Sequence, residues 1–233
     1  MNPGYNDRSE GPFTSTTLTT TVAQSSAEAR LDFIRKTYVL FMAGILMAIV
    51  GGCISLSTPL AGFVLSTLPW SALSLILFVI IASALSHTPG LNYVALFGFT
   101  TITGIIFAPL IALYDPTVVG QAAFLTVIVF GSLTAYAFIS RRDFSYLGGI
   151  LFVGLIALVI GGLANIFFFK SSGASYWMAW VTVFLFSGFV LYDTSQIIHR
   201  YNLNGYCAAA LDLFLDFFNL FLAILRILGG NRD

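Results

Sequence analysis

The sequence predicts an all-α polytopic membrane protein with seven transmembrane helices, and its composition is the first reason. Of its 233 residues, 58% are hydrophobic and only 9% are charged, whereas a soluble domain carries about 25% charged residues. Ten acids and ten bases are too few to cover this much apolar surface, which argues against a soluble enzyme and a disordered chain. The formal net charge is zero, so no overall positive field favours nucleic acid as a partner.

The second reason is that the apolar residues form continuous runs long enough to cross a bilayer, which takes about 20 residues in a helix. Pro59 and Pro69 lie in the connector between the first two runs, and the turn signal Asp115-Pro116 follows the third. Continuous rather than alternating runs predict helices and not a β-barrel. The first three runs are 37–56, 70–86 and 92–113.

The last four runs are 118–139, 146–169, 176–198 and 207–228. Arg141 follows the fourth run and Lys170 follows the fifth, while the polar loop 199–206 separates the last two. Glycines recur inside the runs and predict close approach of neighbouring helices. The only cysteines, Cys53 and Cys207, lie in apolar stretches, and we expect both to be buried without a disulfide or a zinc site.

Charges outside the runs predict the orientation, because cytoplasmic loops carry an excess of Lys and Arg. Seven such residues share the side of the N-terminus and three share the other side. We therefore expect a cytoplasmic N-terminus and an external C-terminus. Residues 1–29 are polar and predict a disordered tail ahead of a seven-helix domain over 30–233. The basic residues are Arg8, Arg30, Arg35, Lys36, Arg141, Arg142 and Arg200 on the first side, and Lys170, Arg226 and Arg232 on the second.

Three acids, Asp193, Asp212 and Asp216, lie inside apolar runs. A charge at the bilayer centre costs at least about 2.5–3.5 kcal/mol, so such residues are typical of functional sites. Asp193 is five residues, roughly 7–8 Å, from the end of the sixth run, and Asp216 is nine residues, roughly 13 Å, into the seventh. Because a short loop joins these antiparallel runs, we expect the two carboxylates to face each other in the cytoplasmic half.

Two carboxylates at close range in a low dielectric do not easily ionise together, so Asp193 and Asp216 are expected to share a proton. They would also provide part of a Ca²⁺ site, because Ca²⁺ prefers carboxylate and carbonyl oxygens. Asp212 and Asn219 share a helix face with Asp216, which predicts that the last helix is central and points this stripe inward. The structural alternative is that these acids fix helix register, or that Asp212 is simply hydrated near the interface.

Two kinds of intramembrane protease place catalytic groups in comparable helices. Tyr192-Asp193 resembles the first motif of the aspartyl type, but no GxGD precedes Asp216, no Pro-Ala-Leu follows, and no later helix is present. A rhomboid-like serine site is also missing, because the sequence has no Gly-x-Ser-Gly and neither histidine lies mid-helix. The residues therefore argue against an enzyme.

The sequence resembles the Bax inhibitor family, also called transmembrane Bax inhibitor motif proteins. The resemblance covers about residues 30–232 and includes the same seven-span layout, and the compact arrangement resembles bacterial members more than others. It rests on Leu191-Tyr192-Asp193-Thr194-Ser195-Gln196, on Leu213-Phe214-Leu215-Asp216-Phe217-Phe218-Asn219-Leu220-Phe221, on Leu225-Arg226 and on the loop Arg142-Asp143-Phe144.

The resemblance implies a bundle around the last helix and a pH-sensitive Ca²⁺ leak channel gated by Asp193 and Asp216. No cofactor is implied beyond Ca²⁺ as a permeant or bound ion. In some bacterial relatives an arginine at the end of the second helix locks the aspartate pair. His87 stands in that region here, and no arginine does. Asp212 also departs from the family pattern, so Asp212, His87 and Asn219 are expected as accessory residues.

The first functional hypothesis is therefore a pH-sensitive calcium leak through an integral multi-pass protein, located in the inner (plasma) membrane if the chain is bacterial. The alternative is a non-conducting protein that binds other membrane proteins and regulates stress responses or membrane proteases. A weaker third hypothesis is a proton-coupled transporter. The expected partners are the lipid bilayer, Ca²⁺ and H⁺, with no nucleic acid.

Overall fold

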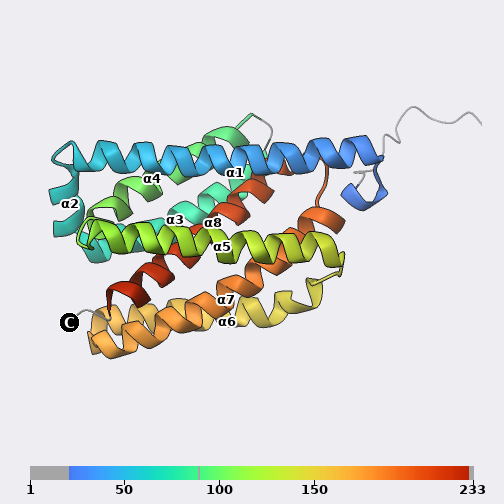
Figure 1. Cartoon of the computed structure of the whole chain (residues 1–233). Coiled ribbons are helices and arrows are strands. Elements are labelled where there is room, and N and C mark those ends of the chain that lie inside the picture. Colours follow the sequence, from blue (N-terminus) through green and yellow to red (C-terminus); the bar gives the residue numbers. More distant parts are fainter. Residues whose placement is uncertain (1–20, 89, 231–233) are drawn as a thin grey trace, which may run out of the picture.

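A computed structural model describes residues 21–88 and 90–230, which are helical almost throughout (Figure 1). Two short 3-10 turns, Val22–Gln24 and Ser145–Leu147, and a π-helical turn, Asn165–Phe169, accompany the α-helices. The α-helices are α1 (Ala27–Leu56), α2 (Leu60–Ser66), α3 (Leu68–Ser86), α4 (Asn92–Ile111), α5 (Pro116–Ser140), α6 (Gly148–Ala164), α7 (Ser172–His199) and α8 (Tyr206–Gly229).

The predicted membrane spans correspond to α1 and to α3 through α8. Within the described residues, six helical segments are long and apolar enough to cross a membrane, and α3 contributes a shorter apolar stretch, Leu73–Ser86. The fold is thus the all-helical polytopic architecture that the sequence predicts. The short helix α2 was not predicted. It forms in the connector because Pro59 precedes its first residue, and Pro69 then stands in the first turn of α3, where proline is tolerated.

The fifth predicted span is not one uniform helix, because α6 passes into the π-helical turn at Asn165. The Asn165 side chain donates to the Ser171 carbonyl at 3.2 Å and to the Ser175 hydroxyl at 2.7 Å, and it accepts from the Ser171 amide at 3.0 Å. Lys170 then takes a left-handed conformation with φ 47°. These bonds satisfy a buried amide and join the end of α6 to the start of α7.

Helix α8 is the centre of the bundle, as predicted for the last span. In its most apolar window 61% of the residues are buried, against 11–44% for the other five long spans. It packs on α7, α1, α5, α4 and α3, and it passes behind α5, between the α1/α4 layer and the α6/α7 pair (Figure 1). Five helices therefore surround most of α8, which allows it to carry polar residues away from lipid.

The ordered helical domain begins before the predicted boundary at residue 30. Val22 is fully buried and its amide donates to the Tyr201 carbonyl at 2.9 Å. Ser26 accepts from the Ala29 amide and so caps the N-terminus of α1. The predicted tail over 1–29 thus includes nine ordered residues, 21–29, because an apolar anchor and a helix cap follow its polar start. Residues 1–20 lie outside the described residues.

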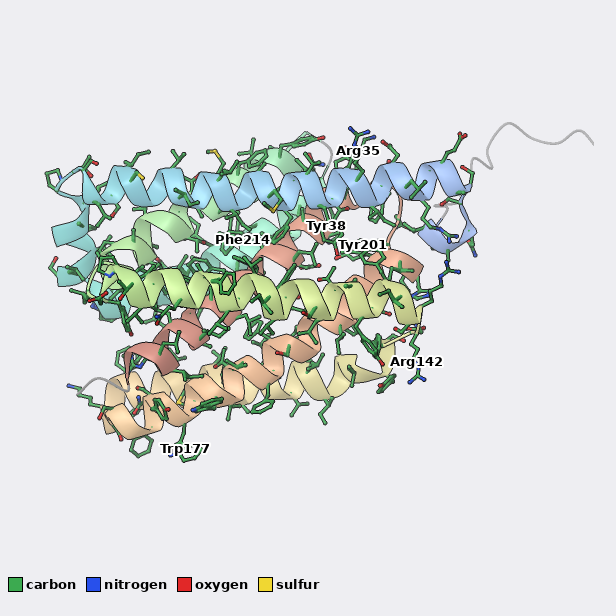
Figure 2. The ribbon with its side chains drawn as sticks, in the orientation of Figure 1. Arg35, Tyr38, Arg142, Trp177, Tyr201 and Phe214 are labelled. Atoms are coloured by element: carbon green, nitrogen blue, oxygen red, sulfur yellow. The ribbon has the colours of Figure 1, made fainter. Side chains whose placement is uncertain are left out.

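The two ends of the bundle carry different charge. Val22 bonds to Tyr201, and Arg200 pairs with Asp143 at 3.1 Å, so the N-terminal segment, the α7–α8 loop and the α5–α6 loop meet at one end. Arg142 lies at that end and Trp177 projects near the other (Figure 2). Among described residues, the basic ones at the first end are Arg30, Arg35, Lys36, Arg141, Arg142 and Arg200, and those at the second are Lys170 and Arg226.

Candidate functional site

The candidate site lies where the end of α7 meets the beginning of α8. Asp193 is on α7, and Asp212 and Asp216 are on α8 one turn apart. Asp216 is 3% exposed and is buried, whereas Asp193 and Asp212 are partly exposed. All three acids are therefore withdrawn into the bundle, and Asp216 is the most buried of them.

Asp193 and Asp216 form the inner pair of this site. Their carboxyl groups lie close enough to interact by a hydrogen bond, and Asp212 is within electrostatic range of both. One oxygen of Asp216, Oδ2, is buried and has no hydrogen-bond partner in the described chain. A buried carboxylate without donors is costly, so this oxygen favours a proton or a cation as its counter-charge.

Asp212 has a direct partner that sequence reasoning missed, namely Tyr201. The Tyr201 hydroxyl, in the α7–α8 loop, donates a hydrogen bond to Asp212 Oδ2. Burial and the neighbouring Asp212 raise the pKa of Tyr201 well above its usual range, so the hydroxyl stays protonated and remains a donor. Figure 2 shows Tyr201 inside the bundle, toward the end that carries Arg142. No spacing rule links a loop tyrosine to an acid eleven residues later, so the sequence offered no signal.

His87 lies near this cluster but does not replace a locking arginine by direct contact. It is an exposed residue at the C-cap of α3, within electrostatic range of Asp212. The ion pairs of residues 21–88 and 90–230 are Lys36–Asp32 and Arg200–Asp143, and neither involves the three site acids. No basic side chain of the described chain is thus paired with Asp193 or Asp216.

Asn219 continues the polar face of α8 toward the other end of the bundle. Positions 212, 216, 219, 223 and 226 follow one another in steps of four and three and so share one side of the helix. The side-chain amide of Asn219 donates to the Leu215 carbonyl at 2.8 Å, and the side chain also lines a cavity of about 350 Å³. Polar residues of that cavity are Asn165, Ser175, Thr182, Asn219 and Arg226.

Apolar side chains separate the aspartate pair from this cavity along α7. Counting from Asp193 toward the cavity residue Thr182, the residues on the same face are Val190 and Phe186. Both are buried, with exposed fractions of 0% and 6%. The face of α8 is thus polar at four of these five positions, with Ala223 between Asn219 and Arg226, while the facing stripe on α7 is interrupted by two apolar turns.

Three buried hydroxyl groups, from α1, α5 and α7, lie close to one another beside Asp193. The Tyr38 hydroxyl of α1 neighbours those of Thr134 on α5 and Thr194 on α7. All three oxygens are buried, and none has a well-formed hydrogen bond to another described residue. Because Thr194 follows Asp193, polar oxygens from three helices stand at the level of the acids.

The loop between α5 and α6 holds the end of α7 in place. Ser195 accepts from the Phe144 amide at 2.9 Å and donates to the Arg142 carbonyl at 3.4 Å. Hydrogen bonds from Ser145, aided by Arg200, lower the pKa of Asp143 to about 2. Asp143 therefore stays ionised across the range in which a buried carboxyl pair would titrate, and it is not a candidate pH sensor.

The donor set is limited as a resident metal site. Across the described residues, no group of three or more His, Cys, Asp or Glu side chains converges to hold a metal ion. Asp193 and Asp216 would supply two carboxylates, whereas Ca²⁺ takes six to eight oxygens. Hydroxyl and backbone oxygens would have to complete any Ca²⁺ site. Such a mixed set of ligands is more typical of a site for a permeant ion than of a site that binds the ion tightly.

Replacing Tyr201 with phenylalanine tests the bond to Asp212. Hydrogen bonds to charged groups are worth about 1.5–3 kcal/mol, so we expect Tyr201→Phe to lower the free energy of unfolding by about 1.5 kcal/mol near neutral pH. Thermal unfolding in detergent measures the change. Tyr146→Phe removes the same hydroxyl from a side chain that is 74% exposed and should have no such effect. Equal shifts in the two variants would contradict the assignment.

The fold and the site together define a polytopic integral membrane protein that keeps three acids inside its helical bundle without an ion pair to a described basic residue. The model of the family described as "Inhibitor of apoptosis-promoting Bax1" matches residues 30–233. The chain belongs to this Bax inhibitor family.

Relatives come from different kinds of organism. The chain is 36% identical to Bax inhibitor 1 of Schizosaccharomyces pombe, over 92% of this chain and 83% of that protein. It is 34% identical to mouse Protein lifeguard 4, with 89% and 88% covered. It is also 32% identical to an uncharacterized membrane protein of Vibrio cholerae, with 90% and 96% covered. Such similarity along nearly whole chains supports one common architecture.

Proposed function

We propose that this protein is a pH-sensitive calcium leak channel in which Asp193 and Asp216 form the gate. The observation that carries the proposal is the inner pair itself, which lies between α7 and α8 and has no basic partner among the described residues. Membrane proteins seldom keep such groups unless protons or ions use them.

The geometry suggests how the gate would work. With a shared proton, the pair can hold α7 and α8 together through a carboxyl–carboxylate hydrogen bond. When that proton leaves, two like charges repel each other at short range in a low dielectric. Separation of α7 from α8 would part Val190 and Phe186 from α8 and join the aspartates to the cavity around Asn219. The carboxylate oxygens of the aspartates would then be open to cations that enter from the cytoplasmic end of the bundle.

The orientation is part of the same proposal. The excess of Arg and Lys at the end that holds residue 30 supports a cytoplasmic N-terminus, and in a bacterium the membrane would be the inner, plasma membrane. Asp193 and Asp212, which are partly exposed, would then sense cytoplasmic pH.

Flux through reconstituted vesicles tests the proposal. The full chain is placed in liposomes loaded with a calcium dye, and the rate of Ca²⁺ entry is followed from pH 5 to pH 8. We expect flux above that of empty liposomes and a clear pH dependence. Asp193→Asn should remove the pH dependence, because the repulsion that opens the gate requires two charged carboxylates and the variant keeps only one of them.

Asp32→Asn is the matched control, because Asp32 is an exposed acid paired with Lys36 outside the site. It should keep the pH profile. Flux equal to that of empty liposomes would overturn the channel and favour the alternative, a non-conducting protein that binds other membrane proteins. Uphill Ca²⁺ movement driven by a pH gradient would instead indicate a proton-coupled transporter.

A further inference from the structure

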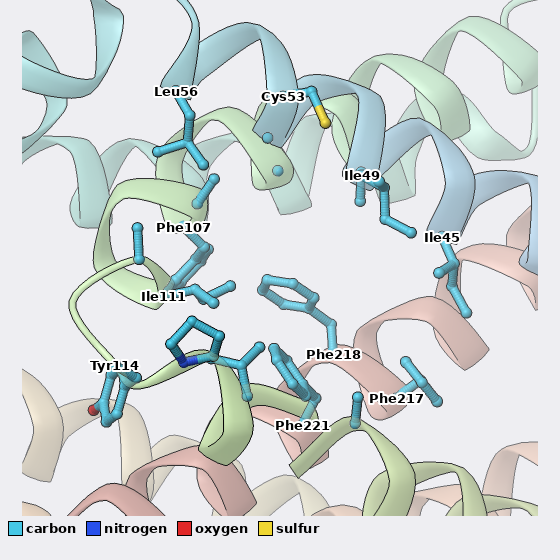
Figure 3. Close-up of a pocket in the computed structure, with 18 of the residues that line it drawn as sticks. Ile45, Ile49, Cys53, Leu56, Phe107, Ile111, Tyr114, Phe217, Phe218 and Phe221 are labelled. Carbon is cyan, nitrogen blue, oxygen red and sulfur yellow. The ribbon is translucent and has the colours of Figure 1, made fainter. Parts of the chain in front are cut away.

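A large apolar cavity lies on the side of α8 that faces away from the aspartates. Its volume is about 650 Å³, and α1, α4, α5 and α8 all contribute to its lining (Figure 3). Phe107 and Ile111 come from α4, while Phe217, Phe218 and Phe221 come from α8. The volume is in the range of sites that bind small organic molecules.

The cavity opens sideways toward the lipid. Helices α1 and α5 both pack on α8 but hardly touch each other, and Figure 1 shows them running one above the other with α8 behind. The α1 residues at this opening are exposed, with Ile49 at 57% and Leu56 at 53%. Cys53 is exposed there too, contrary to the burial expected from its apolar surroundings. In a membrane-spanning bundle these exposed residues face hydrocarbon.

The lining excludes most classes of ligand. It contains no charged side chain, and Cys53 and Tyr114 are its only side chains with a polar atom. Tyr114 belongs to the loop between α4 and α5, beside Pro116 at the start of α5. The polar rim is thus at the loop end of the cavity, and the deeper walls are apolar. This is the distribution that an amphiphile with an apolar tail requires.

We propose that this cavity is a binding site for one acyl chain of a membrane phospholipid, whose headgroup lies at the Tyr114 end. The cavity is continuous with the lipid-facing surface of α1 and α5, where Val50, Phe124 and Val127 are 47%, 66% and 57% exposed. Lipid is the neighbour of that surface on both sides of the opening. Within a bilayer, the gain on binding comes from packing of the acyl chain against the aromatic floor of the cavity.

The site is placed to act on α8. Phe214 and Phe218 are each two residues from Asp216, which puts them about 200° around the helix from it. One face of α8 thus carries the acids and the opposite face forms the floor of the cavity. An occupying chain would support α8 from the side away from α7. The binding site does not depend on whether the protein conducts Ca²⁺.

Photo-crosslinking tests the proposal directly. The full chain is reconstituted in vesicles of phosphatidylcholine and phosphatidylglycerol that contain a trace of phosphatidylcholine with a diazirine midway along one acyl chain. After illumination, mass spectrometry locates the labelled residues. We expect label on the lining, including Phe107 and Phe218, beyond that on outward-facing residues of the same helices.

Ala123→Trp should fill the cavity from α5, because Ala123 lines it and is exposed, and should reduce label on the lining severalfold. Ala135→Trp adds the same indole to an exposed position of α5 outside the cavity and should leave that label unchanged. Cys53→Phe fills the cavity from α1 and replaces the first variant if that one does not fold. Label confined to outward-facing residues, and unchanged in the filled variants, would overturn the proposal. So would efficient Cys53–Cys53 crosslinking between chains, which would assign the groove to a second copy.

Discussion

Replacing Gly104 with alanine is expected to cost at least about 1–3 kcal/mol of stability, the range for overpacked cores. Helices α1 and α4 make the most extensive helix pair in the bundle, and at their crossing Gly104 faces the backbone of Ala48. A Cβ at Gly104 would overlap the Ala48 carbonyl oxygen, and a Cβ at Gly51 would overlap the Thr101 carbonyl oxygen. Backbone atoms inside helices cannot rotate away, so the two helices would have to separate.

Gly98 supplies a matched control on the same helix. A Cβ there would meet nothing within 4 Å, so Gly98→Ala should leave stability unchanged or raise it slightly, since alanine has the higher helix propensity. Thermal unfolding in detergent, followed by the loss of helical circular dichroism, compares the two variants. If both variants melt like the original chain, α1 and α4 do not cross as closely as the structure has them.

The crossing also shows which parts of the packing a sequence can predict. Recurrent glycines within apolar runs predict close helix contacts in general, because a small residue allows backbones to approach. They do not indicate the partner. Gly104 and Gly98 are equivalent in sequence terms, yet only Gly104 meets a neighbouring backbone. The difference depends on the rotation of α4 about its axis, which is set by all the contacts of the bundle.

The sequence allowed the membrane spans to be predicted, but not the local departures from regular helix within and beside them. The length of an apolar run defines a membrane span, so the seven runs correspond to seven helices. Helix α2 and two short 3-10 turns are additional elements that the runs do not predict. The π-helical turn at Asn165 depends on bonds to Ser171 and Ser175, and the ordered segment from residue 21 depends on Val22 reaching Tyr201. Such contacts between different segments leave no periodic signal in the sequence.

The candidate site was partly predictable for a physical reason. Acids inside apolar runs stand out because they are costly, and the antiparallel pairing of the last two helices then brings Asp193 and Asp216 to one level. Tyr201 does not stand out, since an aromatic residue near a membrane interface is ordinary. The aromatic floor of the apolar cavity is equally ordinary in sequence. Its separation from the acids follows only when α8 is placed at the centre of the bundle.

Replacing Asp216 with asparagine is expected to stabilise the protein while removing the pH response of calcium flux. Asp216 is 3% exposed, one of its oxygens has no partner in the described chain, and its nearest charged neighbour is another acid. Asparagine keeps the shape and removes the charge. Two like charges about 4 Å apart repel each other by about 4 kcal/mol at an effective dielectric constant of about 20, so removing one of them is expected to raise the stability by about 1–3 kcal/mol at pH 8.

The pH dependence of this gain separates a functional role from a structural one. The cost belongs to the ionised carboxyl pair, so the gain should be largest at pH 8 and should shrink as the original protein takes up protons toward pH 5. Asp32→Asn, at an exposed acid whose side chain is 59% accessible, should stay within about 0.5 kcal/mol throughout. A loss of stability in Asp216→Asn at pH 8 would mean that the carboxylate fixes the register of α7 and α8, and the gate proposal would then fail. A gain combined with lost pH response would mean that the chain keeps Asp216 at a cost to its own stability, which is the pattern expected of a residue kept for function.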